Sequence, residues 1–255
     1  MASLLIRDLD TVVTCDDADS VHRHVDLYCE DGRIRAIGPD LAVQADEVLD
    51  GSHLLCYPGL INTHHHLYQQ FSRNLPEVQN LELFPWLKAL YEIWKNLDTE
   101  VVHASSLTGM GELMKNGCTT CFDHHYVFPA GCGDLLGAQF AAADELGMRM
   151  VASRGSMDLS VKDGGLPPDS VVQSVDAILE DSAALIERWH DPSYGSMRQI
   201  ALAPCSPFSV SRELLLQSAK LARQYHVRLH THLAETKDEE RYTLDRYGLR
   251  PLAYL

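Results

Sequence analysis

The chain has 255 residues, 45% hydrophobic and 22% charged, a composition that predicts an ordinary folded protein with a substantial core. Its 36 acidic and 21 basic residues give a net charge of −15, which argues against nucleic-acid backbones and anionic membranes as partners. No apolar stretch approaches the ~20 residues of a membrane span, "MASLLIRDLD" meets charge too early for a signal peptide, and seven scattered cysteines fit reduced thiols, so we predict a cytoplasmic location.

Residues 3–56 form the first predicted region, a set of short β-strands. The strands lie within "LLIRDLDTVVTC", "HVDLYCEDGRIRAIG" and "EVLDGSHLLCYPG", and Asp31-Gly32 in the second stretch marks a tight hairpin. We therefore predict a small β domain over residues 1–57, the N-terminal part of a composite β-sandwich.

From Pro58 onward, short apolar runs alternate with longer segments of helical period, which is typical of parallel β/α units. Strands are predicted at 59–63, 118–123, 148–153, 199–205 and 227–233. Helices are predicted at 83–97, from Asp98 or Thr99 to Gly117, at 135–146 before Gly147, from about Pro168 to 190, and at 211–225. The second predicted domain therefore covers residues 58–255.

Five β/α units predict an α/β fold, a (β/α)₈ TIM barrel of which these units form a part. An open doubly wound sheet is the competing architecture, but its first turn would carry glycines, whereas this turn reads "NTHHHLY". Five strands cannot close a barrel that needs about eight. We therefore expect the sequence to cover only part of a functional polypeptide.

Two His-x-His patterns follow predicted parallel strands. His64 and His66 come after the first strand, and the period of two directs both rings the same way while His65 points to the other face. His230 and His232 occupy the fifth strand, with His232 nearer its carboxyl end and His230 more suited to a hydrogen-bonded interior position. Barrel strands deliver their carboxyl ends to one mouth, so we predict a metal site built from His64, His66 and His232.

Three neutral imidazoles with an open position suit Zn²⁺, with Fe²⁺ as an alternative. Such an ion lowers the pKa of a bound water to about 7. Glu235, three residues after His232, is placed to move a proton, although a carboxylate at the start of a helix is the alternative interpretation.

The segments "PGLINTHHHLYQ" and "HTHLAET" resemble the amidohydrolase superfamily, in the branch that holds triazine hydrolases and base deaminases. Further stretches are similar to the 8-oxoguanine deaminases of that branch: "LFPWLKALYEIW", "TTCFDHHYVFPAG", "SRGSMDLS", "GGLPPD" and "APCSPFSVS". The resemblance runs from about residue 3 to the last residue, and members of the family are close to twice as long.

The resemblance implies deamination of 8-oxoguanine, or a close purine, to urate and ammonia. It assigns His64, His66 and His232 as metal ligands and Glu235 as the acid that protonates a ring nitrogen. The family also uses a histidine after strand six and an aspartate after strand eight, which lie outside this sequence, and Asp123 after strand two does not match that aspartate. A homodimer and a small heterocyclic substrate are further expectations.

Substrate contacts are less specific. Gln69 has an amide suited to a purine edge or to a helix cap, and Arg154 suits a substrate oxygen or a salt bridge at the barrel rim. The sequence does not decide which of His124 and His125 faces the pocket. Some nucleoside deaminases of the family have histidine where Cys205 stands, so a nucleoside substrate is disfavoured.

Two other functions compete with the deaminase. A triazine or other N-heterocycle hydrolase would use the same metal site with another leaving group, and a noncatalytic metal-binding fragment would fit the missing later strands. The cytidine-deaminase fold is disfavoured, because Cys118 and Cys121 form a lone C-x-x-C without the H-x-E of that signature.

Overall fold

A computed structural model describes residues 2–255, and the chain divides into two compact units at Gly59 and Leu60. The first unit is a five-stranded sheet with the order β3-β2-β1-β4, and β5 also pairs with β1. Its strands are β1 (Ser3–Val13), β2 (Val21–Glu30), β3 (Arg33–Gly38), β4 (Glu47–Asp50) and β5 (Leu55–Cys56). The predicted composite sandwich stays a prediction.

The hairpin between β2 and β3 turns at Asp31-Gly32, as the sequence predicts. Both residues have positive φ, 53° and 69°, which is the conformation that a two-residue hairpin of matching twist requires. Leu9, Val12, Val25 and Leu27, on β1 and β2, form the small buried apolar core of this unit.

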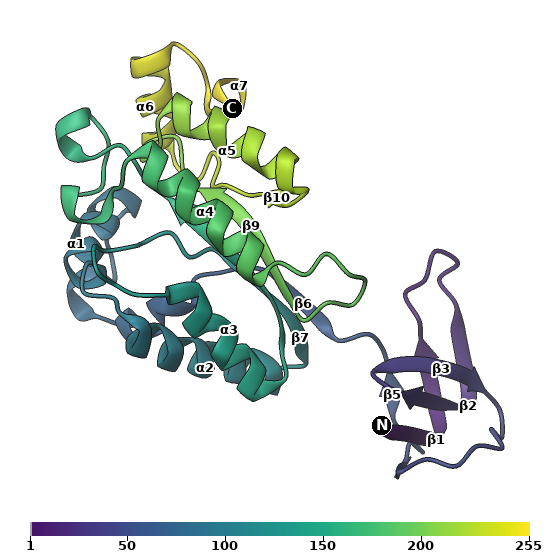
Figure 1. The fold of residues 1–255 in the computed structure, drawn as a ribbon. Coiled ribbons are helices and arrows are strands. Elements are labelled where there is room, and N and C mark those ends of the chain that lie inside the picture. The colour runs from purple at the N-terminus through teal and green to yellow at the C-terminus, as the bar shows by residue number, and fades with distance from the viewer. Residues whose placement is uncertain (1) are drawn as a thin grey trace. The chain divides into compact units, whose positions relative to one another are not determined.

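The second unit is a parallel half-barrel sheet with the order β10-β9-β8-β7-β6 (Figure 1). Its strands are β6 (Leu60–His65), β7 (Cys118–Asp123), β8 (Arg149–Ser156), β9 (Arg198–Pro204) and β10 (Arg228–Leu229). Because the strands are neighbours in chain order and run in one direction, their carboxyl ends lie along one edge. The predicted succession of five β/α units is confirmed.

The helices follow the strands in chain order, two of them between β6 and β7 and the last two after β10. They are α1 (Leu83–Trp94), α2 (Thr99–Lys115), α3 (Leu135–Leu146), α4 (Val175–Trp189), α5 (Arg212–Tyr225), α6 (Lys237–Tyr247) and α7 (Pro251–Tyr254). Short 3₁₀ turns are η1 (Leu67–Ser72), η2 (Pro76–Val78), η3 (Val161–Asp163) and η4 (Asp169–Val171). Within residues 2–255, no helix is long and apolar enough to cross a bilayer.

Helix ends follow local signals in most cases. The Asp98 carboxylate accepts a hydrogen bond from the Val101 amide at the start of α2, and Gly147 ends α3 in the left-handed conformation. The helix predicted from Pro168 is wrong by seven residues, since α4 begins at Val175. The backbone amide of Gln173 donates to the carbonyl of Met157 rather than to a carbonyl within a helix. This long-range bond delays the start of α4 until Ser174 caps it.

Strand ends differ more from the prediction. β6 continues to His65, so His64 lies within the strand rather than after it, and β8 continues to Ser156. β10 is shorter than predicted and ends at Leu229. Beyond it, the amide of His230 donates to the Leu202 carbonyl and that of His232 to the Cys205 carbonyl, a step that breaks the regular ladder with β9.

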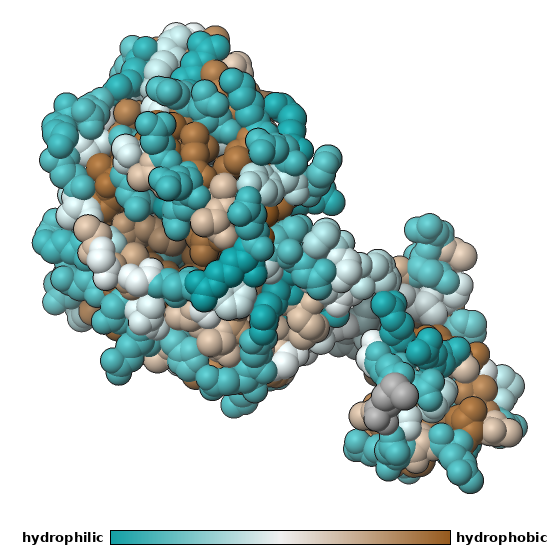
Figure 2. Space-filling view, viewed as in Figure 1, coloured by the Kyte–Doolittle hydropathy of each residue, from teal (hydrophilic) through white to brown (hydrophobic). Residues whose placement is uncertain are grey.

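The main core lies between the half-barrel sheet and its helices, and includes Trp94, Phe140, Met150 and Ile200. Polar residues cover much of the face shown in Figure 2, with apolar patches between them. The outer strands expose apolar side chains, namely Leu60 and Ile61 on β6 and Leu229 on β10.

Candidate metal centre

Three histidines meet at the carboxyl edge of the half-barrel sheet. The Nε2 atom of His66 lies 3.2 Å from Nε2 of His64 and 3.3 Å from Nε2 of His232. Each of the three offers a nitrogen within 4.8 Å of the others. The structure thus brings together the residues of the two sequence patterns that were predicted to share an ion.

Backbone carbonyls fix the protonation of two of these rings. Nδ1 of His66 lies 2.7 Å from the carbonyl oxygen of His124, and Nδ1 of His232 lies 2.9 Å from that of Cys205. A carbonyl only accepts, so each Nδ1 carries the proton and each Nε2 presents a lone pair. Two lone pairs that face each other across 3.3 Å repel unless a cation lies between them.

The donor set therefore fits a divalent cation. Imidazole nitrogens at ~2.0–2.1 Å from a tetrahedral Zn²⁺ would lie ~3.3–3.4 Å apart. The distances from Nε2 of His66 to Nε2 of His64 and of His232, 3.2 and 3.3 Å, are close to that value. Burial lowers the pKa of His66 well below its usual value and that of His232 to about 4, and also lowers the pKa of His64. All three rings are thus neutral at pH 7, the form that binds metal.

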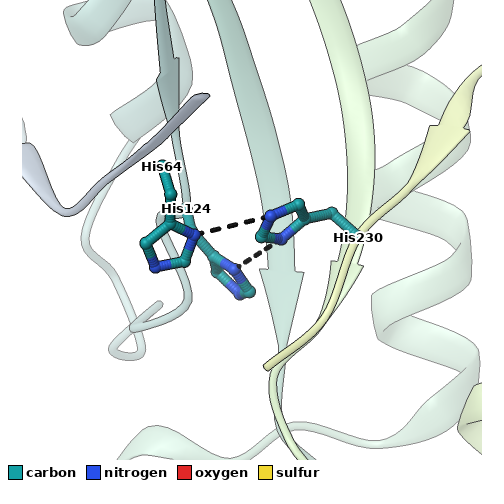
Figure 3. A group of neighbouring side chains, drawn as sticks. All are labelled: His64, His124 and His230. Carbon is teal, nitrogen blue, oxygen red and sulfur yellow. Dashed lines mark hydrogen bonds between the residues drawn. The ribbon is translucent and has the colours of Figure 1, made fainter. Parts of the chain in front are cut away.

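His230, the other histidine of the second pattern, turns to a different group (Figure 3). Its Nδ1 lies 3.0 Å from Nδ1 of His124, and its Nε2 lies 3.4 Å from Nδ1 of His64. His124 is buried and stacks on His232 with ring centroids 4.2 Å apart. Of the two histidines after β7, His124 is therefore the one that joins the cluster.

His125 belongs to the core instead. Its ring is buried, its Nε2–H donates to the carbonyl of Val127 at 3.0 Å, and it contacts the rings of Tyr68 and Phe128 edge-on. Burial lowers the pKa of His125 to about 3, so this ring is neutral under all ordinary conditions.

Asp123 does not enter the cluster, in agreement with the sequence interpretation. Its buried carboxylate accepts hydrogen bonds from the Leu67 amide at 2.5 Å and from the side-chain amide of Gln139 on α3 at 2.6 Å. Burial raises its pKa to about 7. Asp123 thereby holds the turn that directly follows His66.

Glu235 lies beside the histidine cluster, and its side chain lines a cavity of about 230 Å³ with His66 and His232. Burial raises the pKa of this carboxyl, and the nearby carboxylate of Glu239 raises it further. The remaining walls of the cavity are mainly apolar and aromatic, and include Leu83, Trp86, Leu87, Tyr126 and Phe208, with Gln69 and Cys205 as further polar members.

Glu239 is a residue that the sequence interpretation missed. Its carboxylate is buried and accepts from the amides of Ala234, at 2.9 Å, and Glu235, at 2.8 Å. Ala234 has a φ of 57°, a left-handed conformation that is unfavourable for alanine. A capping signal was visible, because Thr236 and Glu239 have the spacing of a capping box.

Gln69 lines the cavity, with its side-chain nitrogen 3.4 Å from the hydroxyls of Tyr68 and Tyr126, and its substrate contact stays a prediction. Arg154 does not line this cavity, and its substrate contact stays a prediction. Its buried guanidinium donates to Asp181 on α4 at 2.6 Å, to Gln173 at 2.7 Å and to the Gly155 carbonyl. The ion pair with Asp181 is the alternative that the sequence left open for Arg154.

Several known proteins are similar to this chain in sequence. The model of the amidohydrolase family matches residues 55–254. The 8-oxoguanine deaminase of Pseudomonas aeruginosa is 48% identical over 232 residues, 90% of this chain and 52% of the relative. Hydroxydechloroatrazine ethylaminohydrolase of Pseudomonas sp. strain ADP is 38% identical over 265 residues, 99% of this chain and 55% of the relative.

Among solved structures, a triazine hydrolase from Arthrobacter aurescens superposes with a TM-score of 0.94 at 32% identity, covering 100% of this chain and 57% of the other. The atrazine chlorohydrolase of Arthrobacter aurescens TC1, complexed with zinc, gives 0.93 at 32% identity, with 99% of this chain and 57% of the other covered. The chain thus spans about half the length of the curated relatives it matches. By sequence and by fold, the chain belongs to the amidohydrolase family.

Proposed function

We propose that this chain is the metal-binding part of an aminohydrolase that converts 8-oxoguanine, or a close purine, and water into urate, or the matching oxo-purine, and ammonia. The observation that carries the proposal is the convergence of three neutral imidazole Nε2 atoms beside a cavity that also receives Glu235. The 48% identity to a bacterial 8-oxoguanine deaminase supports this choice of substrate.

His64, His66 and His232 would hold the ion, with Zn²⁺ preferred and Fe²⁺ as the alternative. When bound, the cation supplies Lewis-acid activation of water for attack on the amino-bearing carbon. The carbonyls of His124 and Cys205 keep two of the ligands in the tautomer that leaves Nε2 free. These contacts orient the rings before any ion arrives.

Glu235 would hold a proton and deliver it to a ring nitrogen of the substrate, which makes the neighbouring carbon more electrophilic. The raised pKa of this carboxyl supports that role, because a proton is then retained closer to neutral pH. The Glu239 carboxylate supports this role of Glu235 in two ways. Its like charge raises the pKa of Glu235, and it accepts a hydrogen bond from the Glu235 backbone amide, which fixes the backbone there.

The cavity suits a flat heterocycle. Trp86, Tyr126 and Phe208 offer aromatic surface to a planar ring, and the Gln69 amide offers both a donor and an acceptor. We propose Gln69 as a substrate contact. The barrel would be completed by further strands that carry the histidine and aspartate which the family resemblance implies. The homodimer and the cytoplasmic location stay predictions.

The second candidate is a triazine or other N-heterocycle hydrolase, favoured by the superposition on triazine hydrolases. Release of ammonia and urate from 8-oxoguanine would support the leading proposal. Release of chloride or alkylamine from triazines, without any purine turnover, would replace it with the second. A metal-loaded protein that turns over neither class would favour the noncatalytic alternative.

Glu235→Gln tests the proton-transfer role directly. We expect the variant to keep its metal and to lose kcat by roughly 10²–10⁴-fold, since general acid catalysis contributes about that much. Metal content is measured by elemental analysis and turnover by ammonia release. Near-normal turnover would mean that another group handles the proton.

A further inference from the structure

His230 lies between two other imidazoles and faces each of them with a different nitrogen. Its Nε2 lies 3.4 Å from Nδ1 of His64, and its Nδ1 lies 3.0 Å from Nδ1 of His124 (Figure 3). The ring of Phe122 on β7 packs against the ring of His230 at a centroid distance of 4.5 Å, with 33° between the planes. His230 therefore has a defined ring position with a neighbour at each nitrogen.

The proton positions along this row depend on each other. A neutral imidazole donates from one nitrogen and accepts at the other, so only two arrangements satisfy both contacts. In one, Nδ1–H of His64 donates to Nε2 of His230, and Nδ1–H of His230 donates to Nδ1 of His124. In the other, every bond is reversed and the proton of His64 lies on Nε2.

Only the first arrangement leaves Nε2 of His64 free to bind a cation with His66 and His232. The row then ends at His124, whose proton lies on Nε2, a buried atom without a hydrogen-bond partner among residues 2–255. His230 would thus accept the Nδ1 proton of His64, as the carbonyls of His124 and Cys205 accept those of His66 and His232. Each of the three rings would have its own Nδ1 acceptor.

The three nitrogens of His64, His124 and His230 also lie close enough for a metal ion. The contacts argue against that use, because an imidazole holds one cation through one nitrogen, whereas His230 faces its two neighbours with two. His64 would also have to bind two ions at once through opposite nitrogens. A hydrogen-bonded row accounts for both contacts.

We propose that His230 is a positioning residue that accepts the Nδ1 proton of His64 and so holds His64 in the metal-binding tautomer, with His124 fixing His230 in turn. The inference rests on the proposed metal site. It predicts that His230 controls metal affinity without being a ligand.

The test is a zinc titration of the metal-stripped chain against a chromophoric chelator. The wild type should bind one equivalent, and His230→Ala should still bind one, with a Kd that is about 10–100-fold weaker. His230→Gln should recover part of the affinity, since its amide can accept from His64. His103→Ala is the matched control, because His103 lies on α2 and pairs with Glu145, and its Kd should stay within about twofold of the wild type.

Two results would overturn the proposal. An unchanged Kd in His230→Ala would show that His64 needs no such acceptor. Two equivalents in the wild type that fall to one in His230→Ala would make His230 a ligand of a second ion. If His230→Ala does not fold, nitrogen-15 NMR of the metal-free wild type decides: the proposal requires the protons of His64 and His230 on their Nδ1 atoms, and a His64 proton on Nε2 would overturn it.

The same titration separates this inference from the proposed function. A wild type that binds one zinc tightly but turns over no purine would remove the proposed function and leave the role of His230 intact. A wild type that deaminates 8-oxoguanine, with His230→Ala equal to it in zinc affinity, would do the opposite. A chain that binds no zinc would overturn both.

Discussion

The two His-x-His segments share one sequence pattern but differ in what they present. In the first, His64 and His66 both direct Nε2 to the cluster. In the second, His232 does so, while His230 turns to His64 and His124. The cause lies in the neighbouring strands: the ladder of β6 with β7 extends to His65, whereas the ladder of β10 with β9 ends at Leu229. A shared pattern thus gives different side-chain roles when the backbone pairing differs.

The largest expected effect comes from His232→Ala. Loss of one of three nitrogen donors should weaken zinc binding by at least ~10³-fold, well beyond the 10–100-fold expected of a supporting residue such as His230. Elemental analysis after dialysis measures occupancy, with His230→Ala beside it. Full zinc occupancy in His232→Ala would mean that His232 is not a ligand, so that the two histidines of the second segment would no longer differ in this way.

Acidification should destabilise the metal-free protein, because the buried His232 ring resists protonation in the folded state. The pKa of His232 is about 4 in the folded state against 6.5 in the unfolded chain, so the unfolded chain binds more protons as pH falls below 6.5. The contribution of His232 to the free energy of unfolding is present above pH 6.5 and is lost as the pH falls towards 4. The loss amounts to roughly 3 kcal/mol at most.

Chemical denaturation at several pH values, in the wild type and in His232→Ala, isolates this contribution from the carboxylates that titrate in the same range. A free energy of unfolding that falls equally in both proteins would mean that the His232 ring is solvated.

A smaller effect, on the stability of the fold, is expected from the backbone conformation at the end of each His-x-His segment. His66 has a φ of −132°, whereas Ala234, two residues after His232, has a φ of 57°. Ala234→Gly should stabilise the fold by ~0.5–1 kcal/mol, because glycine adopts this conformation without steric cost. Thermal unfolding measures it, with Ala141→Gly on the exposed face of α3 as the control, which should destabilise by ~1 kcal/mol.

The smallest effect belongs to the middle residue of the first pattern. His65→Ala should leave zinc affinity within about twofold of the wild type, since alternate residues of a strand point to opposite faces. The same chelator titration checks this. A tenfold loss would mean that the period of two does not hold at the end of β6.

Local patterns predicted most of the elements. Asp98 and Gly147 carry their own capping signals, and the period of two separated His64 and His66 from His65. What failed depended on distant partners. The backbone hydrogen bond from Gln173 to Met157 delays α4, and the pairing of β8 with β9 carries β8 on to Ser156. No pattern within a short window contains that information.

The buried Asp123 carboxylate gives the half-barrel a link between its helical layer and its histidine centre. It receives one bond from the turn after His66 and another from Gln139 on α3. A shift of α3 against the sheet would therefore reach the His66 ring through two short hydrogen bonds. Substitutions on this helix are places where evolution or design would change the affinity of the proposed metal site.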